Sequence, residues 1–179
     1  VRLRAIAPAP GTPAAEPTAR RTPAAGGGPW VLWASQTGGA EQVAAGLGDR
    51  LAGAGVEAAL IGMDDCAPDD LVDARDVLVV TSTFGDGGPP DNGADFWDRL
   101  REPDAPALAG VRFAVLGIGD RSYGQFCGRA RSLDDRFAEL GAVRLVDRID
   151  CEADDDEPRA RWVRQITALF GGPDAAPGE

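Results

Sequence analysis

Neither lysine nor histidine occurs among the 179 residues of this chain, so arginine carries all of its positive charge. Without lysine the chain cannot form the phosphate-binding loop of nucleoside triphosphatases, in which a lysine holds the terminal phosphates. The three cysteines, Cys66, Cys127 and Cys151, are too few and too widely spaced for a disulfide framework or a zinc site. We therefore expect the three cysteines to be small buried side chains. A reducing cytoplasm is the expected location of the protein.

Long apolar runs are also missing. No stretch approaches the roughly 20 apolar residues that cross a membrane, and residues 1–4 lack the apolar segment of a secretion signal. Acidic residues outnumber arginines and give a net charge of −11, although residues 1–29 are basic. A chain with this net negative charge is repelled by nucleic acid and by anionic membranes. Its expected macromolecular partner is a protein with a basic surface.

Proline, alanine and glycine dominate both ends of the sequence. Residues 1–28 show no apolar periodicity and are interpreted as a disordered linker, and residues 171–179 as a flexible tail. The folded domain is then residues 29–170, which is enough to bury an ordinary core. Linkers on both sides, together with a first residue that is not methionine, indicate a module of a longer polypeptide.

Short apolar segments alternate with helical periodicity inside this domain. Three segments are almost wholly apolar, as strands covered on both faces are, and two mixed segments belong at the edges of a sheet. The apolar strands are expected at residues 30–34, 77–81 and 111–116, and the mixed ones at 56–61 and 143–149. This distribution predicts an α/β, doubly wound fold of three layers with five parallel strands in the order 2-1-3-4-5.

Four apolar stripes at helical spacing lie between and after these strands. Gly53 is expected to end the first helix and Gly141 the third. Asp91 or Asn92 is expected to cap the second helix, and Pro158 fits the first turn of the last one.

The first strand is followed by a loop that leads into a helix. A helix N-terminus presents unpaired N–H groups and a partial positive charge, so a phosphate can bind there without lysine. Glycines let the backbone wrap closely, and hydroxyl groups add donors. The glycine spacing is not that of the dinucleotide-binding fingerprint, which disfavours NAD; the alternative is an ordinary capped turn. The loop consists of Ser35, Gln36, Thr37, Gly38, Gly39 and Ala40.

Two further loops lie at the same end of the predicted sheet. The second loop (Ser82, Thr83, Phe84 and Gly85) offers an aromatic ring beside a glycine that can turn its peptide freely. The third loop contains Tyr123, and two aromatic rings could enclose a flat heterocycle. Taken singly, either ring could instead be a packing residue. The residues of the third loop are Ile118, Gly119, Asp120, Arg121, Ser122, Tyr123, Gly124, Gln125, Phe126 and Cys127.

Three strings in these loops resemble the flavodoxin-like FMN domains of diflavin reductases, and among them the sulfite reductase flavoproteins most of all. The strings are S-Q-T-G-G-A-E at 35–41, T-S-T-F-G-D-G-G-P-P-D-N at 81–92 and L-G-I-G-D-R-S-Y-G-Q-F-C at 116–127. The resemblance spans about residues 30–170 and implies FMN as the cofactor. Residues 35–40 would surround its phosphate, and residues 82–85 and 118–127 would flank the isoalloxazine.

In this resemblance Phe84 and Tyr123 would cover the two faces of the ring, and the Gly85 carbonyl would accept a hydrogen bond from N5–H of the half-reduced flavin. Phe84 stands where several relatives have tyrosine or glutamine. Arg121, near the ring edge, has no role in the family pattern. Neither a catalytic residue nor a metal ligand is implied.

The resemblance implies a one-electron shuttle between an FAD/NADPH reductase module and a haem or metal acceptor. FAD and NADPH would bind only to partner domains, so this domain would not be a complete enzyme by itself. Two alternatives stay open: a free-standing flavodoxin-type carrier, or an FMN module fused to a nitrate reductase-like enzyme. A receiver-like signalling domain of the same strand order is disfavoured, because no acids end the first and third strands and lysine is absent.

Two acidic clusters are either solvated surfaces or docking sites for a basic partner. We favour docking for the first cluster only. The first cluster is Asp86, Asp91, Asp95 and Asp98, and the second is Asp150, Glu152 and residues 154–157.

Overall fold

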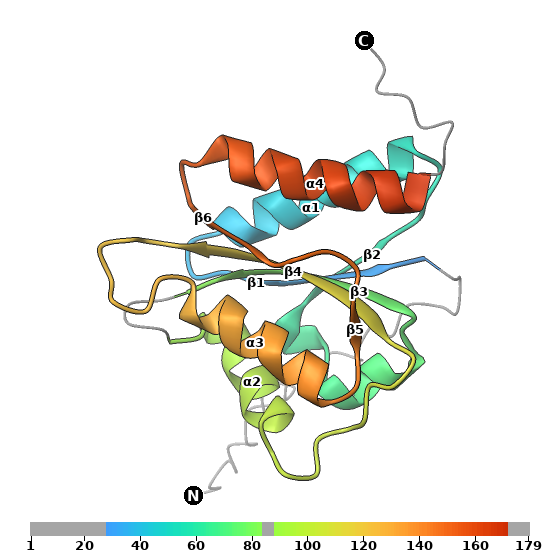
Figure 1. Ribbon diagram of the computed structural model, residues 1–179, viewed down its shortest axis with the longest axis vertical. Helices are drawn as coiled ribbons and strands as arrows, with labels where there is room; N and C mark the ends of the chain where they lie inside the picture. The colour runs from blue at the N-terminus through green and yellow to red at the C-terminus, as the bar shows by residue number, and fades with distance from the viewer. Residues whose placement is uncertain (1–27, 84–87, 172–179) are drawn as a thin grey trace, which may run out of the picture.

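The computed structural model describes residues 28–83 and 88–171. Their strands form one parallel sheet, and helices cover both faces of it (Figure 1). The strands are β1 (Trp30–Ala34), β2 (Ala59–Gly62), β3 (Asp76–Ser82), β4 (Arg112–Gly119), β5 (Val143–Arg144) and β6 (Ile149–Glu152). The helices are α1 (Gly39–Gly53), α2 (Ala94–Leu100), α3 (Gly128–Glu139) and α4 (Asp156–Gly171), with 3₁₀ segments at Met63–Asp65, Pro68–Asp73 and Asp91–Gly93.

The strand order is β2-β1-β3-β4-β5, and every pairing is parallel. The predicted three-layer fold and its strand order are therefore confirmed. Helices α1 and α4 cover one face of the sheet, and α2 and α3 cover the other (Figure 1).

The predicted fifth strand over residues 143–149 is wrong as a single element. The structure has β5, which pairs with the beginning of β4, and β6, which pairs with its end, so the sheet has six strands. The Leu145 amide still donates to the Phe113 carbonyl of β4 over 2.7 Å, and the chain then leaves the ladder until β6 begins. An edge strand is paired on one side only, so such a departure removes few hydrogen bonds. Ion pairs from Arg144 and Arg148 to Asp134 on α3 hold the departing segment.

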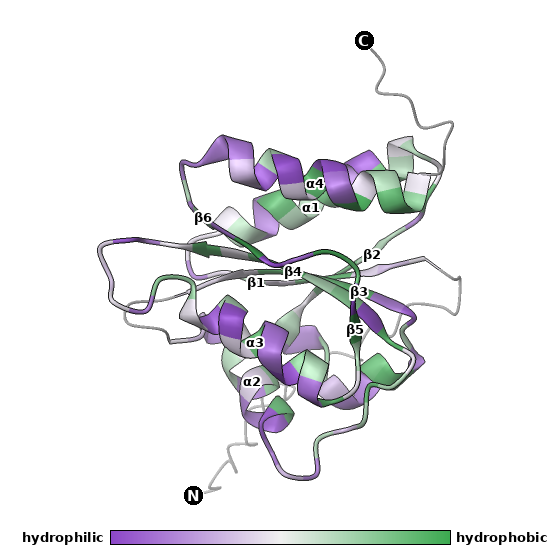
Figure 2. Cartoon of the chain, viewed as in Figure 1, coloured by the Kyte–Doolittle hydropathy of each residue, from purple (hydrophilic) through white to green (hydrophobic). Residues whose placement is uncertain are grey.

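Alternate side chains of the central strands supply two separate cores. Val77 and Val79 of β3 pack with the helices α2 and α3, whereas Leu78 and Val80 pack with α1 and α4. Burial on both faces explains why the central strands are continuous apolar runs. Figure 2 shows the contrast between the apolar strands and the polar outer surfaces of the helices.

The helix boundaries largely follow the predicted glycine signals. α1 ends at Gly53, and Gly141 adopts a φ of 99° two residues beyond α3. Such a positive φ is readily adopted only by glycine. The predicted cap at Asp91 or Asn92 is wrong, because α2 has no side-chain cap and Asn92 binds the end of β1 instead.

All three cysteines are buried and free, as the sequence predicted. None of the helices in the described part of the chain is long and apolar enough to cross a membrane.

Candidate functional site

The sheet register brings the three predicted loops to the same edge. Ala34, Thr81 and Gly117 occupy matched positions near the carboxyl ends of β1, β3 and β4. Hydrogen bonds then link one loop to the next. The Gln36 amide donates to Ser82 Oγ over 3.3 Å, and the Thr83 amide donates to the Ile118 carbonyl over 2.9 Å. The described parts of all three loops therefore form one continuous rim.

The first loop is folded around the side chain of Ser35. Its Oγ accepts hydrogen bonds from the amides of Gly38 (2.8 Å) and Ala40 (3.3 Å), which leaves its own proton free to be donated. Gly38 has a φ of 88° and immediately precedes α1. This left-handed residue turns the chain so that the helix N-terminus opens onto the loop.

The rest of the first loop is open. Within residues 28–83 and 88–171, the amides of Thr37 and Gly39 meet no acceptor. A Cβ atom added at Gly38 or Gly39 would contact nothing within 4 Å. Unpaired amides, a free hydroxyl and a helix N-terminus are the donors that suit a phosphate. The loop thus fits the phosphate of a nucleotide.

Asn92 braces the first loop, a role that sequence reasoning missed because no local pattern signals it. Its Oδ1 accepts from the Ser35 amide over 2.9 Å, and its Nδ2 donates to the Trp33 carbonyl over 3.4 Å. The neighbouring Asp91 forms a reciprocal pair with Gln36: Nε2 of Gln36 donates to Oδ2 of Asp91, and the Asp91 amide donates to Oε1 of Gln36. The segment before α2 is therefore bound directly to the first loop.

The third loop contains a local turn followed by an exposed ring. The amide and hydroxyl of Ser122 both donate to Oδ1 of Asp120, and these bonds lower the pKa of that carboxyl. The Tyr123 amide donates to the Asp120 carbonyl over 3.2 Å, and the residue is 45% exposed. An exposed tyrosine on a turn rich in polar residues is available to cover a flat ligand.

Cys127 belongs to the core rather than to the exposed rim. It is fully buried, has a φ of 50°, and its thiol donates to the Cys151 carbonyl over 3.8 Å. Burial, with the charge of Asp150, raises the pKa of Cys127 to about 12, so the thiol is protonated and unreactive. A Cβ atom at Gly119 would lie 2.9 Å from this sulfur. Ala40 and Ile118 are likewise buried, so their side chains also belong to the core.

Phe84, Gly85 and Asp86 lie outside the described residues, and their predicted contacts stay predictions. Thr83, the last described residue before them, is held by a residue of α3. The Arg129 amide donates to Thr83 Oγ1 over 3.3 Å, and its guanidinium lies 4.4 Å from the centre of the Trp97 ring. The point where the second loop begins is thus fixed by α3.

A groove of about 540 Å³ runs between α1 and α4 and meets the first loop only at Gly39. Arg50, Arg159 and Arg164 line it. Two of these arginines are already paired, Arg159 with Asp156 and Arg164 with Glu157. The groove therefore offers little free positive charge, and we assign no ligand to it.

The two acidic clusters differ in how far arginines neutralise them. In the first, Asp98 pairs with Arg101, whereas Asp91 and Asp95 meet no arginine within the described residues. In the second, arginines pair with all but one of the acids. These paired acids are Asp150, Glu152, Asp155, Asp156 and Glu157.

The doubly wound parallel sheet has the strand order β2-β1-β3-β4-β5, and the loop after its first strand presents backbone amides that meet no acceptor among the described residues. These two features define a flavodoxin-like nucleotide-binding domain. Comparison with known proteins supports the same class. Residues 31–162 match the flavodoxin family, and the chain belongs to that family. FMN is the cofactor of the family, and electron transfer is the role that accompanies it.

Curated relatives are flavoproteins of sulfite reduction. The chain is 40% identical over 173 residues to the sulfite reductase [NADPH] flavoprotein alpha-component of Bacillus subtilis (strain 168), covering 94% of this chain and 29% of that protein. It is also 40% identical over 140 residues to the same component of Neisseria meningitidis serogroup C (strain 053442), covering 78% and 23%. The chain thus spans less than a third of the length of these relatives.

Solved structures of flavodoxins share the fold. A cysteine-to-alanine mutant of flavodoxin from Pseudomonas aeruginosa superposes with a TM-score of 0.68 at 30% identity, covering 80% of this chain and 99% of that one. The flavodoxin of Streptococcus pneumoniae TIGR4 gives a TM-score of 0.68 at 27% identity, covering 76% and 93%.

Proposed function

We propose that the three loops hold FMN at the carboxyl edge of the sheet. In this role the domain passes single electrons from an FAD- and NADPH-binding reductase module to a haem or metal acceptor. The observation that carries the proposal is the first loop, where amides, a hydroxyl and a helix N-terminus meet no acceptor or side chain among the described residues, in a chain without lysine. The similarity to sulfite reductase flavoproteins supports the direction of electron flow.

Each part of the rim has a defined task in this proposal. Ser35 and the amides of Thr37 and Gly39, which meet no acceptor among the described residues, bind the phosphate, and the N-terminus of α1 stabilises its negative charge. Tyr123 covers one face of the isoalloxazine and shields it from water, and Phe84 is assigned to the other face. Bound FMN supplies the one-electron chemistry. We assign this role to the domain predicted at residues 29–170, which the structure extends by one residue because α4 continues through Gly171.

Acidic residues near the rim influence both the kind of protein that docks there and the redox potential of the bound cofactor. Asp91 and Asp95 are exposed and have no arginine partner among the described residues. Their charge disfavours added negative charge on a nearby cofactor and attracts a basic protein surface. We place the domain in the cytoplasm, where its three free cysteines stay reduced.

The proposal is tested by titrating the apoprotein with FMN. We expect one FMN per chain and quenching of flavin fluorescence on binding. Tyr123→Ala should weaken binding about tenfold, because a stacked aromatic contributes on the order of 1 kcal/mol beyond its buried area. Tyr123→Phe retains the ring and should bind nearly as well as the wild type.

The one-electron role is tested by measuring the redox potentials of the FMN-bound protein by potentiometry. Two separate one-electron potentials are expected. A chain that ignores added FMN would refute the proposal as a whole. Equal affinities of the wild type and Tyr123→Ala would remove this ring from the site but leave the phosphate loop in place.

A further inference from the structure

We propose that Arg121 is a positioning residue that latches the third loop to the turn between β6 and α4. The inference rests on the proposed function, because this loop carries Tyr123. Family resemblance assigned no task to Arg121, and its contacts in the structure supply one.

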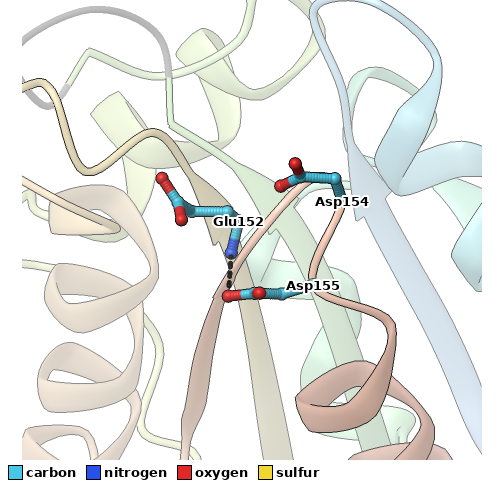
Figure 3. A group of neighbouring side chains, drawn as sticks. All are labelled: Glu152, Asp154 and Asp155. Atoms are coloured by element: carbon cyan, nitrogen blue, oxygen red, sulfur yellow. Dashed lines mark hydrogen bonds between the residues drawn. The ribbon is translucent and has the colours of Figure 1, made fainter.

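Arg121 engages the end of β6 with both its backbone and its side chain. Its amide donates to Oε1 of Glu152 over 3.1 Å, and its Nε donates to Oε2 of the same carboxylate over 3.2 Å. Its Nη2 lies 3.6 Å from Oδ2 of Asp155. Asp155 is held in turn by the Glu152 amide, which donates to its Oδ2 over 3.4 Å (Figure 3). The arginine thus faces a prearranged pair of carboxylates.

No other residue between 120 and 126 reaches a distant element by a hydrogen bond or ion pair within the described residues. Ser122 and Tyr123 bond only to Asp120, and the Gln125 carbonyl accepts from the Gly128 amide just beyond the loop. The Arg121 guanidinium also lies 4.7 Å from the centre of the Phe126 ring. One side chain therefore joins the beginning of the loop to its end and both to β6.

The nearby carboxylates could be read as a cation site instead. Oxygens of Glu152, Asp154 and Asp155 all lie within 4.8 Å of one another (Figure 3). Two of the three already face the charge of Arg121, however. The cluster therefore acts as the counter-charge of the arginine.

A latch of this kind affects ligand affinity more than fold stability. The side chain of Arg121 is 59% exposed, and exposed ion pairs contribute little to the free energy of unfolding. An untethered loop, by contrast, must be ordered each time the ligand binds, and that entropy loss weakens binding. Removal of the latch should therefore leave the apoprotein folded but poorly prepared for FMN.

The test compares Arg121→Ala with Arg164→Ala, which removes an equally exposed arginine from its pair with Glu157 on α4. FMN affinity, quenching of flavin fluorescence, visible circular dichroism of the bound flavin and thermal midpoint of the apoprotein are measured for each. Arg121→Ala should raise the dissociation constant about fivefold and change the dichroism and the quenching. Its thermal midpoint should match that of Arg164→Ala.

Arg121→Lys supplies the conservative comparison. Lysine keeps the charge but lacks the planar fork that bonds Glu152 and stacks on Phe126, so only part of the affinity should return. The latch is refuted if Arg121→Ala binds FMN as the wild type does, or if its loss of affinity merely follows a lowered thermal midpoint. A wild type that binds no FMN would refute the proposed function and the latch together, whereas an unaffected Arg121→Ala would refute the latch alone.

Discussion

Asn92 forms hydrogen bonds with two backbone groups at the end of β1, 57 and 59 positions away in the sequence. Both groups, the Ser35 amide and the Trp33 carbonyl, are partly buried. A single amide side chain satisfies one donor and one acceptor there, which neither a carboxylate nor a hydroxyl can do with the same geometry. The position of the first loop thus depends on a residue outside it.

Asn92→Ala should lower the free energy of unfolding by about 1–3 kcal/mol, because it removes the acceptor of the Ser35 amide and the donor that Asn92 supplies to the Trp33 carbonyl. It should also weaken FMN binding, since Ser35 loses its brace. Urea denaturation and FMN titration measure the two effects. Asn92→Asp retains the acceptor for the Ser35 amide but cannot donate to Trp33, so an intermediate loss is expected. An alanine variant as stable as the wild type would show that water replaces the side chain.

At the scale of elements, α3 fixes the irregular edge of the sheet through Asp134. This carboxylate is almost fully buried and accepts hydrogen bonds from Arg144 Nη2 at 2.8 Å and Arg148 Nη1 at 3.5 Å. The pair with Asp134 raises the pKa of Arg144. Arg144 is the last residue of β5 and Arg148 directly precedes β6, so one helical residue holds both ends of the interruption.

Asp134→Ala should lower the free energy of unfolding by about 2 kcal/mol, less than for a fully buried pair, because both arginines are partly exposed. Asp135→Ala is the matched control on the same helix. Its carboxylate is 61% exposed and lies 3.8 Å from Arg144, so its loss should have almost no effect. Chemical denaturation of both variants decides the matter: equal stabilities would mean that packing alone holds this edge.

At the scale of the whole molecule, arginines neutralise the acidic residues behind the net charge of −11 to different extents in different places. The second acidic cluster is largely neutralised by arginines, whereas Asp91 and Asp95 of the first cluster are exposed and meet no arginine in the described part of the chain. Unpaired charge steers a partner more strongly than paired charge. The preference for the first cluster as the docking surface stays a prediction.

Electron transfer from the reduced domain to a basic acceptor protein should slow as salt is added, because the screening length falls from about 10 Å at 0.1 M to about 3 Å at 1 M. Asp95→Asn should lower both the rate at low salt and its salt dependence. Asp156→Asn, which alters an acid already paired with Arg159, should leave both unchanged. Stopped-flow measurements test this, and identical salt dependence in all three proteins would argue against docking at the first cluster.

The sequence by itself determined the sheet, its strand order and the edge at which the loops gather. Apolar runs such as that of β3 and stripes such as that of α1 are local patterns, and burial on one or two faces follows from their period. Only the tertiary structure decided the division of the edge strand, the brace at Asn92 and the latch at Arg121. Each of these depends on a partner far away in the chain, 31 positions for Arg121 with Glu152. A local pattern carries no information about which distant group will satisfy a polar side chain.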